Sequence, residues 1–320
     1  MPDYRLFGGV LRSDLEFPEL PPVSAASPTW TLHRRAELPD LGGLSPLGTE
    51  DVDPGVTVTL FRAGTSLRLV FDDTGAFEIS ADGRQIHWVA PPAPDMDAVR
   101  KDVLGRVLAV ALDQAGVTTL HGSAVGIGEV AVAFLAPKFH GKSTTATALV
   151  NAGGRLLADD LVPVTGGGRP MVLPSVPVVQ LWADSAARVG GEAAPATPEQ
   201  VAPKRQVVWK DVHRNADAAV PLAAVYLLAP VKSDAGVRVT RTQISGVQAA
   251  LALLGQAKVG GLLGVERRSA LLDRLVALGA RISVYRLEIP RDFDRIGELT
   301  SSLIGWHTDG VSPSATEATA

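Results

Sequence analysis

The feature that most constrains the fold is an apolar run, residues 130–136 (VAVAFLA), that ends directly at the loop sequence PKFHGKS. A short continuous apolar run predicts a buried strand, and this one is far shorter than the roughly 20 residues that a membrane helix needs. Residues 143–150 predict a helix that ends at the NAGG of residues 151–154. A buried strand that leads through a short loop into a helix is typical of an α/β fold, and we expect a mixed, twisted sheet.

The loop ends as a phosphate-binding loop does. A strand, a loop that ends in Gly-Lys-Ser and a helix that begins at the lysine turn backbone N–H groups toward a phosphate chain. There, Lys142 would neutralise the β- and γ-phosphates, Ser143 would hold Mg²⁺ through its hydroxyl, and Gly141 would allow close backbone approach. We predict nucleotide contacts from the loop and the first helical turn. These residues are Ala136, Pro137, Lys138, Phe139, His140, Gly141, Lys142, Ser143 and Thr144.

The same loop departs from the usual pattern. Ala136 replaces the usual first glycine, and Phe139 and His140 stand where glycine or alanine is common. A positive φ at Phe139 would strain the backbone. In a nucleotide site the Phe139 ring could stack on the base or cover the phosphates. The alternative is a surface turn that contains Gly-Lys-Ser by chance.

Another strand, residues 155–158, ends at two adjacent carboxylates, Asp159 and Asp160. Neighbouring residues of a strand point to opposite faces, so the two side chains can serve different partners, a metal ion and a reacting hydroxyl. Solvated charges at a strand-end turn are the alternative interpretation.

Three motifs together resemble the HPr kinase/phosphorylase family and its kinase-like relatives: His121-Gly122-Ser123, the Gly-Lys-Ser loop and the LADDLV of residues 157–162. The resemblance is strongest over residues 118–165 and extends more weakly to about residue 307. It implies a P-loop kinase core similar to that of phosphoenolpyruvate carboxykinase. The YRLFG of residues 4–8 and the SDLEFPEL of residues 13–20 look like the N-terminus of relatives that phosphorylate lasso-peptide precursors.

The resemblance also implies roles for individual side chains. Asp159 would be the base that takes the proton from the acceptor hydroxyl, and Asp160 would help hold Mg²⁺. His121 would line the acceptor side of the phosphates, with an ordinary strand-end histidine as the alternative. The predicted catalytic residues are therefore Asp159, His121 and Lys142, and the predicted metal ligands are Ser143 and Asp160. The Glu-Arg-Gly segment that HPr kinases carry after the aspartates is missing, so HPr itself is not the expected acceptor.

Composition narrows the classes of function. The formal net charge is −4 and the pI is about 5.9, which predicts no sequence-wide attraction to nucleic acid or to an acidic membrane. The chain has no cysteine, which excludes disulfides and thiol catalysis. Residues 1–17 lack the basic-then-apolar layout of a signal peptide, which favours a cytoplasmic protein. No spacing of His, Asp and Glu indicates a structural zinc site, so Mg²⁺ is the one metal that we expect.

Residues 1–94 predict a β-rich N-terminal domain. They carry short alternating apolar runs, at 56–61, 67–71 and 77–80, separated by turn residues. The prolines of residues 91–94 predict a stiff boundary before the next element.

Residues 95–310 predict the nucleotide-binding catalytic domain, and residues 311–320 a disordered tail. Apolar residues at helical spacing predict a first helix that begins at Asp95 and ends before Gly116. Further strands are expected at 118–125, 161–165, 171–174, 222–229 and 282–289, and further helices at 246–257 and 266–279.

These patterns predict a kinase that transfers the γ-phosphoryl group of ATP, or of GTP, to a hydroxyl. The favoured acceptor is a Ser or Thr of a peptide or protein, such as a ribosomal peptide precursor, for which an open groove or free sheet edge is expected. A small-molecule kinase with a closed polar pocket is the first alternative, and a non-catalytic nucleotide-binding regulatory protein is the second. Because the resembled family has hexameric members, homo-oligomerisation is a further expectation.

Overall fold

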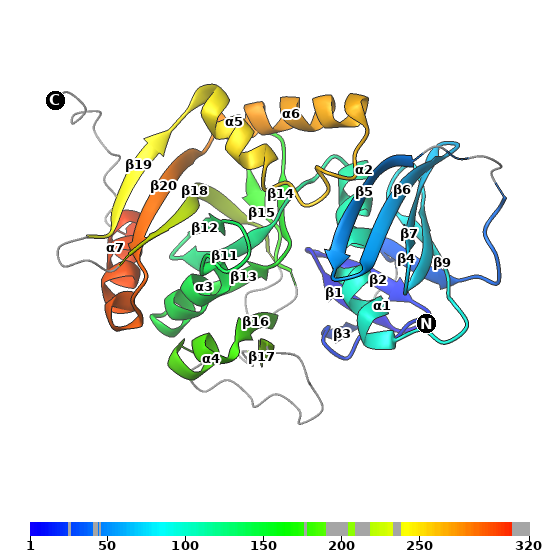
Figure 1. Ribbon diagram of the computed structural model, residues 1–320, viewed down its shortest axis with the longest axis horizontal. Helices are drawn as coiled ribbons and strands as arrows, with labels where there is room; N and C mark the ends of the chain where they lie inside the picture. The colour runs from blue at the N-terminus through cyan, green and yellow to red at the C-terminus, as the bar shows by residue number, and fades with distance from the viewer. Residues whose placement is uncertain are drawn as a thin grey trace.

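The computed structural model describes residues 1–24, 27–40, 44, 46–175, 178–189, 204–208, 218–232 and 238–308. In these residues two large mixed sheets lie side by side with helices packed against them (Figure 1). The expected α/β class with mixed sheets is confirmed. The predicted tail, residues 311–320, lies outside the described residues.

The N-terminal sheet is formed by strands that follow one another closely in sequence. They are β1 (Asp3–Leu6), β2 (Gly9–Ser13), β3 (Pro22–Val23), β4 (Trp30–Arg34), β5 (Pro46–Asp53), β6 (Val56–Ala63), β7 (Ser66–Phe71), β8 (Gly75–Ile79) and β9 (Gln85–Val89). Their spatial order is β3-β1-β2-β4-β9-β8-β7-β6-β5. The three predicted apolar runs are confirmed as β6, β7 and β8, and their residues alternate between buried and more exposed positions.

One interrupted helix connects the two sheets. It consists of α1 (Met96–Asp102), the π-helical turn η1 (Val103–Val107) and α2 (Leu108–Gln114). Asp95 caps its N-terminus by accepting hydrogen bonds from two backbone N–H groups. The predicted apolar face is confirmed because Val99, Val103 and Val107 are fully buried. The π-helical turn is a feature that the apolar spacing does not predict.

In the C-terminal sheet the Gly-Lys-Ser loop lies at the carboxyl ends of the parallel strands. Its strands are β10 (Thr118–Leu120), β11 (Gly122–Ile127), β12 (Val130–Leu135), β13 (Arg155–Asp159), β14 (Val162–Thr165), β15 (Met171–Val172), β18 (Val220–Val231), β19 (Thr240–Ile244) and β20 (Ser283–Pro290). β18 pairs in parallel with both β12 and β20. The carboxyl ends of these three strands therefore meet at one edge, where open α/β sheets bind ligands.

Helices and a small ribbon surround this sheet. They are α3 (Lys142–Asn151), α4 (Ala183–Val189), α5 (Gly246–Leu254), α6 (Val265–Gly279), η3 (Phe293–Arg295) and α7 (Ile296–Thr308), with the ribbon β16 (Val178–Trp182) and β17 (Lys204–Val208). The predicted helices are confirmed as α3, α5 and α6, whereas α4 and α7 are not predicted by the sequence. α6 extends toward the N-terminal sheet, where Arg62 lies 3.8 Å from Glu266 (Figure 1).

The two sheets share one hydrophobic core, which includes residues of β1, β2, β4 and β6–β9, of the connecting helix and of β10–β15. Backbones also meet directly: a Cβ on Gly48 of β5 would lie 2.6 Å from the carbonyl oxygen of Gly261. Beside this contact, Nε of Arg106 donates to Glu50 at 3.3 Å. The N-terminal sheet is thus packed on the segment that follows α5. Within the part of the chain that is described, no helix has both the length and the apolar character needed to span a membrane.

Candidate active site

The Gly-Lys-Ser loop connects β12 to α3, as the sequence predicts. Gly141 is the N-cap of α3 and has a φ of 88°, in the left-handed region that glycine adopts without strain. Because α3 begins at Lys142, the backbone N–H groups of its first turn and the positive end of its dipole face the loop. A helix N-terminus of this kind can bind an anion.

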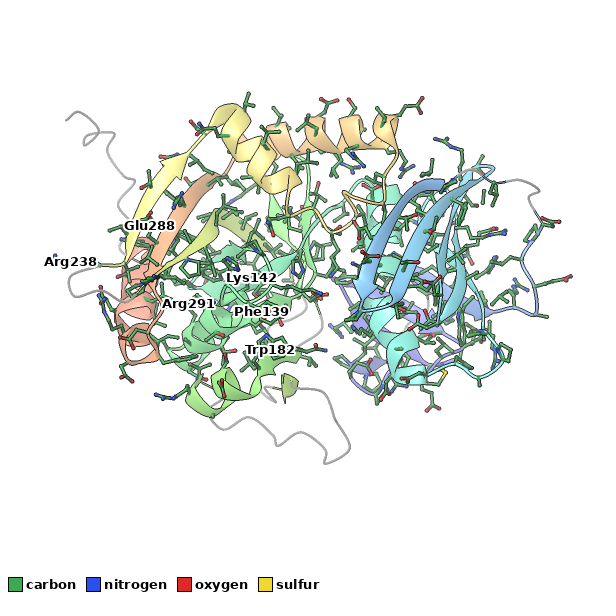
Figure 2. All side chains as sticks on the ribbon, viewed as in Figure 1. Phe139, Lys142, Trp182, Arg238, Glu288 and Arg291 are labelled. Atoms are coloured by element: carbon green, nitrogen blue, oxygen red, sulfur yellow. The ribbon has the colours of Figure 1, made fainter. Side chains whose placement is uncertain are left out.

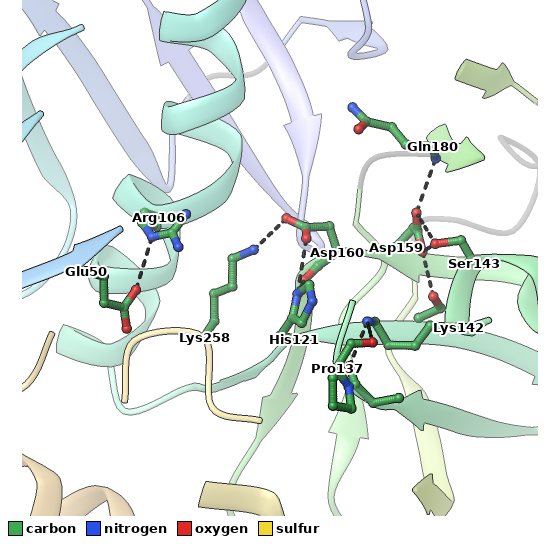
Figure 3. A network of polar contacts seen from close by, with 12 residues as sticks. Glu50, Arg106, His121, Pro137, Lys142, Ser143, Asp159, Asp160, Gln180 and Lys258 are labelled. Atoms are coloured by element: carbon green, nitrogen blue, oxygen red, sulfur yellow. Dashed lines mark hydrogen bonds and ion pairs between the residues drawn. The ribbon is translucent and has the colours of Figure 1, made fainter. Parts of the chain in front are cut away.

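The side chain of Lys142 folds back across the loop. Its Nζ donates to the carbonyl oxygens of Ala136 at 2.7 Å and Pro137 at 3.1 Å (Figure 3). The residue is only 9% exposed. These carbonyl oxygens hold a positive charge beside the N-terminus of α3, which concentrates positive potential at one point of the loop.

Phe139 has the strained backbone that its position suggests. Its φ is 69°, a conformation that costs a residue with a side chain roughly 1–2 kcal/mol. The residue is 64% exposed, and its ring stacks on that of Trp182 with 5.1 Å between centroids. Nη2 of Arg291 donates to the carbonyl oxygen of Phe139 at 3.1 Å (Figure 2). Contacts at the ring and the backbone therefore hold the strained conformation.

Asp159 lies at the end of β13, beside the first turn of α3. Its Oδ1 accepts from Oγ of Ser143 at 2.9 Å and from Oγ of Ser123 at 2.5 Å. Its Oδ2 accepts from the backbone N–H of Gln180 at 3.3 Å (Figure 3). Burial, together with the charge of Asp160, raises the pKa of the Asp159 carboxyl, although these hydrogen bonds oppose the change.

Asp160 has different partners. Its Oδ1 lies 3.2 Å from Nδ1 of His121, and its Oδ2 accepts from Nζ of Lys258 at 2.6 Å (Figure 3). Desolvation opposes the charge of this carboxylate, but Lys258 and His121 outweigh it and hold the pKa of Asp160 well below its usual range. Its side chain remains 58% exposed. Asp160 is therefore an ionised carboxylate that a ligand in the cleft can reach.

His121 and Lys258 come together through backbone pairing. The N–H of His121 donates to the carbonyl oxygen of Gln256 at 2.7 Å, and the N–H of Lys258 donates to that of Thr119 at 2.9 Å. This pairing brings both side chains beside Asp160, although Lys258 is 98 residues away from it in sequence. Lys258 is a site residue that sequence reasoning missed, because the surrounding QAKVGG contains no motif that points to Asp160.

Two further predicted loop residues, His140 and Thr144, make polar contacts with nearby residues. Nδ1 of His140 lies 2.9 Å from the carbonyl oxygen of Lys138, so the ring is turned back onto the loop. Oγ1 of Thr144 donates to Oγ of Ser185 in α4 at 3.2 Å. Thr144 thereby connects the first turn of α3 to α4.

These groups line one open cleft of about 2410 Å³. Its lining contains residues 137–144, His121, Asp159 and Asp160. Ala136 is buried and contributes its carbonyl oxygen to Lys142. The cleft continues to residues 18–22 beside the N-terminal sheet and to the carboxyl end of β20. The predicted residues therefore gather in one place, between the two sheets.

Two neighbouring oxygen-bearing side chains, Ser143 and Asp159, could hold Mg²⁺. Mg²⁺ usually binds one or two protein carboxylates together with substrate phosphates and water. The hydroxyl of Ser143 and the carboxylate of Asp159 lie side by side and fit that pattern. Among the described residues, no group of three or more His, Cys, Asp or Glu side chains could form a protein-only metal site.

Comparisons with known proteins give a limited result. No protein-family model matches the sequence, and no curated protein matches it. Solved structures do match, among them the HPr(Ser) kinase/phosphatase from Coxiella burnetii. That match has 11% sequence identity and a TM-score of 0.30, and it covers 60% of this chain and 99% of the other. It is a weak similarity of fold.

Proposed function

We propose that this protein is a kinase that transfers the γ-phosphoryl group of a nucleoside triphosphate to a hydroxyl group. One observation carries the proposal: a single cleft holds a lysine–serine pair at a helix N-terminus and, beside it, an ionised, reachable carboxylate. The lysine and the serine can bind a triphosphate with Mg²⁺, and the carboxylate can take the proton of an acceptor hydroxyl. Phosphoryl transfer needs both parts close together.

The triphosphate would lie against the loop and the N-terminus of α3. Its β- and γ-oxygens would accept hydrogen bonds from loop N–H groups and replace the two carbonyl oxygens that now hold Lys142. Ser143 and Asp159 would hold Mg²⁺, which neutralises charge on the phosphates when it is bound.

The contacts favour an exchange of the two aspartate roles that the family resemblance implies. Asp159 accepts from Ser143, the predicted metal ligand, so it belongs on the metal side. Asp160 contacts His121, the predicted acceptor-side residue, and Lys258. We therefore assign the acceptor proton to Asp160 and the metal to Asp159 with Ser143.

In this mechanism the acceptor oxygen forms a bond to the γ-phosphorus while the bond from that phosphorus to the β–γ bridging oxygen breaks. The acceptor proton moves to Asp160, and the nucleoside diphosphate leaves. The transition state of phosphoryl transfer is loose, so orientation of the acceptor matters more than the strength of the base. Lys258 and His121 supply that orientation by fixing both oxygens of Asp160.

The favoured acceptor is a Ser or Thr side chain of a peptide or protein. Sites for small molecules usually measure about 300–1,000 Å³, whereas this cleft has about 2410 Å³ and continues to the N-terminal sheet. An open cleft of that size accommodates a nucleotide and an extended segment together. A metabolite kinase would need a closed polar pocket at Asp160.

Transfer of label tests the proposal. The purified protein is incubated with γ-labelled ATP and Mg²⁺ and a mixture of peptides and metabolites, beside Lys142→Ala and Asp160→Asn. We expect label on an acceptor with the parent alone. Asp160→Asn should keep nucleotide affinity and lose transfer, whereas Lys142→Ala should weaken both. Nucleotide binding without transfer to any acceptor would instead support the non-catalytic regulatory protein.

A further inference from the structure

The most unusual side chain of the cleft is Phe139. Its backbone has a φ of 69°, which glycine would adopt without strain, and the residue is 64% exposed. The large exposed fraction means that the ring is not there to fill a core. An exposed aromatic ring on a strained backbone at a ligand site indicates a role toward a ligand.

The ring is held in place. Trp182, at the end of β16, stacks on one face of it with an interplanar angle of 26°. Arg291, directly after β20, donates to the carbonyl oxygen of Phe139. Two elements far apart in sequence therefore fix the ring and the loop that carries it (Figure 2). A ring fixed in advance loses little conformational freedom when it binds a flat partner.

The position suits a nucleobase. Phe139 lies in the loop that leaves the carboxyl end of β12, and Arg291 follows the carboxyl end of the parallel strand β20. Pro230, at the carboxyl end of β18, lines the same cleft as Phe139 and Trp182. A triphosphate on Lys142 would extend its nucleoside along this edge.

We propose that the stacked pair Phe139–Trp182 is the base-binding shelf of the site and takes a purine. This inference rests on the proposed function, because the phosphates must lie on the loop for the base to reach the shelf. Stacking uses the face of a base and not its edge, so ATP and GTP should bind alike, and pyrimidine nucleotides, with smaller rings, more weakly.

Binding of three ligands to the intact protein tests the shelf: Mg-ATP, Mg-GTP and Mg-tripolyphosphate, which has no base. Phe139→Gly removes the ring and keeps the backbone unstrained, and Phe139→Asn repeats the test with a residue that also tolerates positive φ. Calorimetry should give roughly tenfold weaker binding of both nucleotides to each variant and the parent's affinity for tripolyphosphate. Phe139→Tyr keeps an aromatic ring and should regain most of the nucleotide affinity that the other two variants lose.

The possible results distinguish a failure of the base-binding shelf from a failure of the proposed phosphate-binding loop. Equal losses for nucleotides and tripolyphosphate, or no loss for either, overturn the shelf. A parent that binds ATP no more tightly than tripolyphosphate also overturns it and leaves the phosphate loop intact. A parent that binds none of the three ligands overturns the proposed function and the shelf with it. Thermal unfolding of each variant, compared with the parent, checks that the fold is retained.

Discussion

The ammonium group of Lys258 lies 2.6 Å from Oδ2 of Asp160, although 98 residues separate the two in sequence. The lysine side chain is only 9% exposed, while the carboxylate is 58% exposed. A mostly buried cation thus holds one oxygen of a reachable carboxylate, and His121 holds the other. This leaves Asp160 ionised and oriented toward the cleft before any ligand arrives.

Removal of this ammonium should lower turnover more than it lowers nucleotide affinity. Lys258→Met retains the apolar stem and removes the charge, and we expect kcat to fall on the order of 100-fold while the nucleotide Kd changes little. The pKa of Asp160 should rise toward its ordinary value, so activity should fail at higher pH than in the parent as the solution is acidified. Steady-state kinetics across pH measures both effects.

Lys258→Arg is the matched control. It keeps the positive charge, so its activity should fail at the same acidic pH as that of the parent. Lys232→Met tests an exposed lysine outside the cleft lining and should leave kinetics as they are. Loss of turnover in Lys258→Met without a change in the pH profile would assign Lys258 a purely structural role.

Ser143→Ala should raise the Mg²⁺ concentration required for activity. The variant removes a hydroxyl that lies 2.9 Å from Asp159 and leaves that carboxylate as the one protein group of the proposed donor pair. We expect about a tenfold rise in the Mg²⁺ concentration at half-maximal rate, with partial recovery at saturating Mg²⁺. A Mg²⁺ titration at fixed ATP measures it. An unchanged titration curve would remove Ser143 from the metal site.

His307 should make the protein less stable in mild acid. Burial, and then the charge of Arg241, lower the pKa of His307 to about 4, and its ring contacts the hydroxyl of Tyr226 at 2.7 Å. Because the unfolded chain takes up this proton near pH 6.5, stability is complete above that pH and declines as the pH falls toward 4. The decline should reach up to about 2–3 kcal/mol in the free energy of unfolding. Urea titrations at pH 7.5 and 4.5 measure it.

His307→Gln cannot be protonated, so its free energy of unfolding should decline less over the same interval. Equal declines in the variant and the parent would show that other groups cause the acid sensitivity.

Asp102→Asn should stabilise the protein at neutral pH. Burial raises the pKa of Asp102 to about 6, even though Thr74 donates to its Oδ2 at 2.7 Å. The folded state therefore binds this proton more tightly than the unfolded chain, and the resulting stability is full below pH 3.8 and lost as the pH rises through 6. Asparagine removes the charge and should add up to about 2 kcal/mol at pH 7.5 and little at pH 4. Chemical denaturation at both pH values measures this.

Asp73→Asn is the control for Asp102→Asn, since Asp73 is an exposed neighbour and should change stability by under about 0.5 kcal/mol. A stabilisation that is as large at pH 4 as at pH 7.5 would contradict the role of charge.

The sequence by itself determined the local structure around the loop. The apolar run at 130–136, the glycine before Lys142 and the helical residues after it predict β12, the loop and α3, because each depends on interactions between near neighbours. The adjacency of Asp159 and Asp160 at a strand end was also readable, although Asp160 follows β13 with a φ of 67°, so a turn and not strand alternation separates the two side chains.

Only the tertiary structure decided which partners these groups meet. Lys258 reaches Asp160 because its backbone pairs with that of β10. Trp182 and Arg291 contact Phe139 from two distant elements. The hydroxyl of Ser143 donates to Asp159. No local pattern encodes these pairings, because each depends on how strands far apart in the chain are ordered in the sheets. The sequence therefore predicted that a site exists at the loop, whereas packing of the elements decided the environment and charge of each side chain within it.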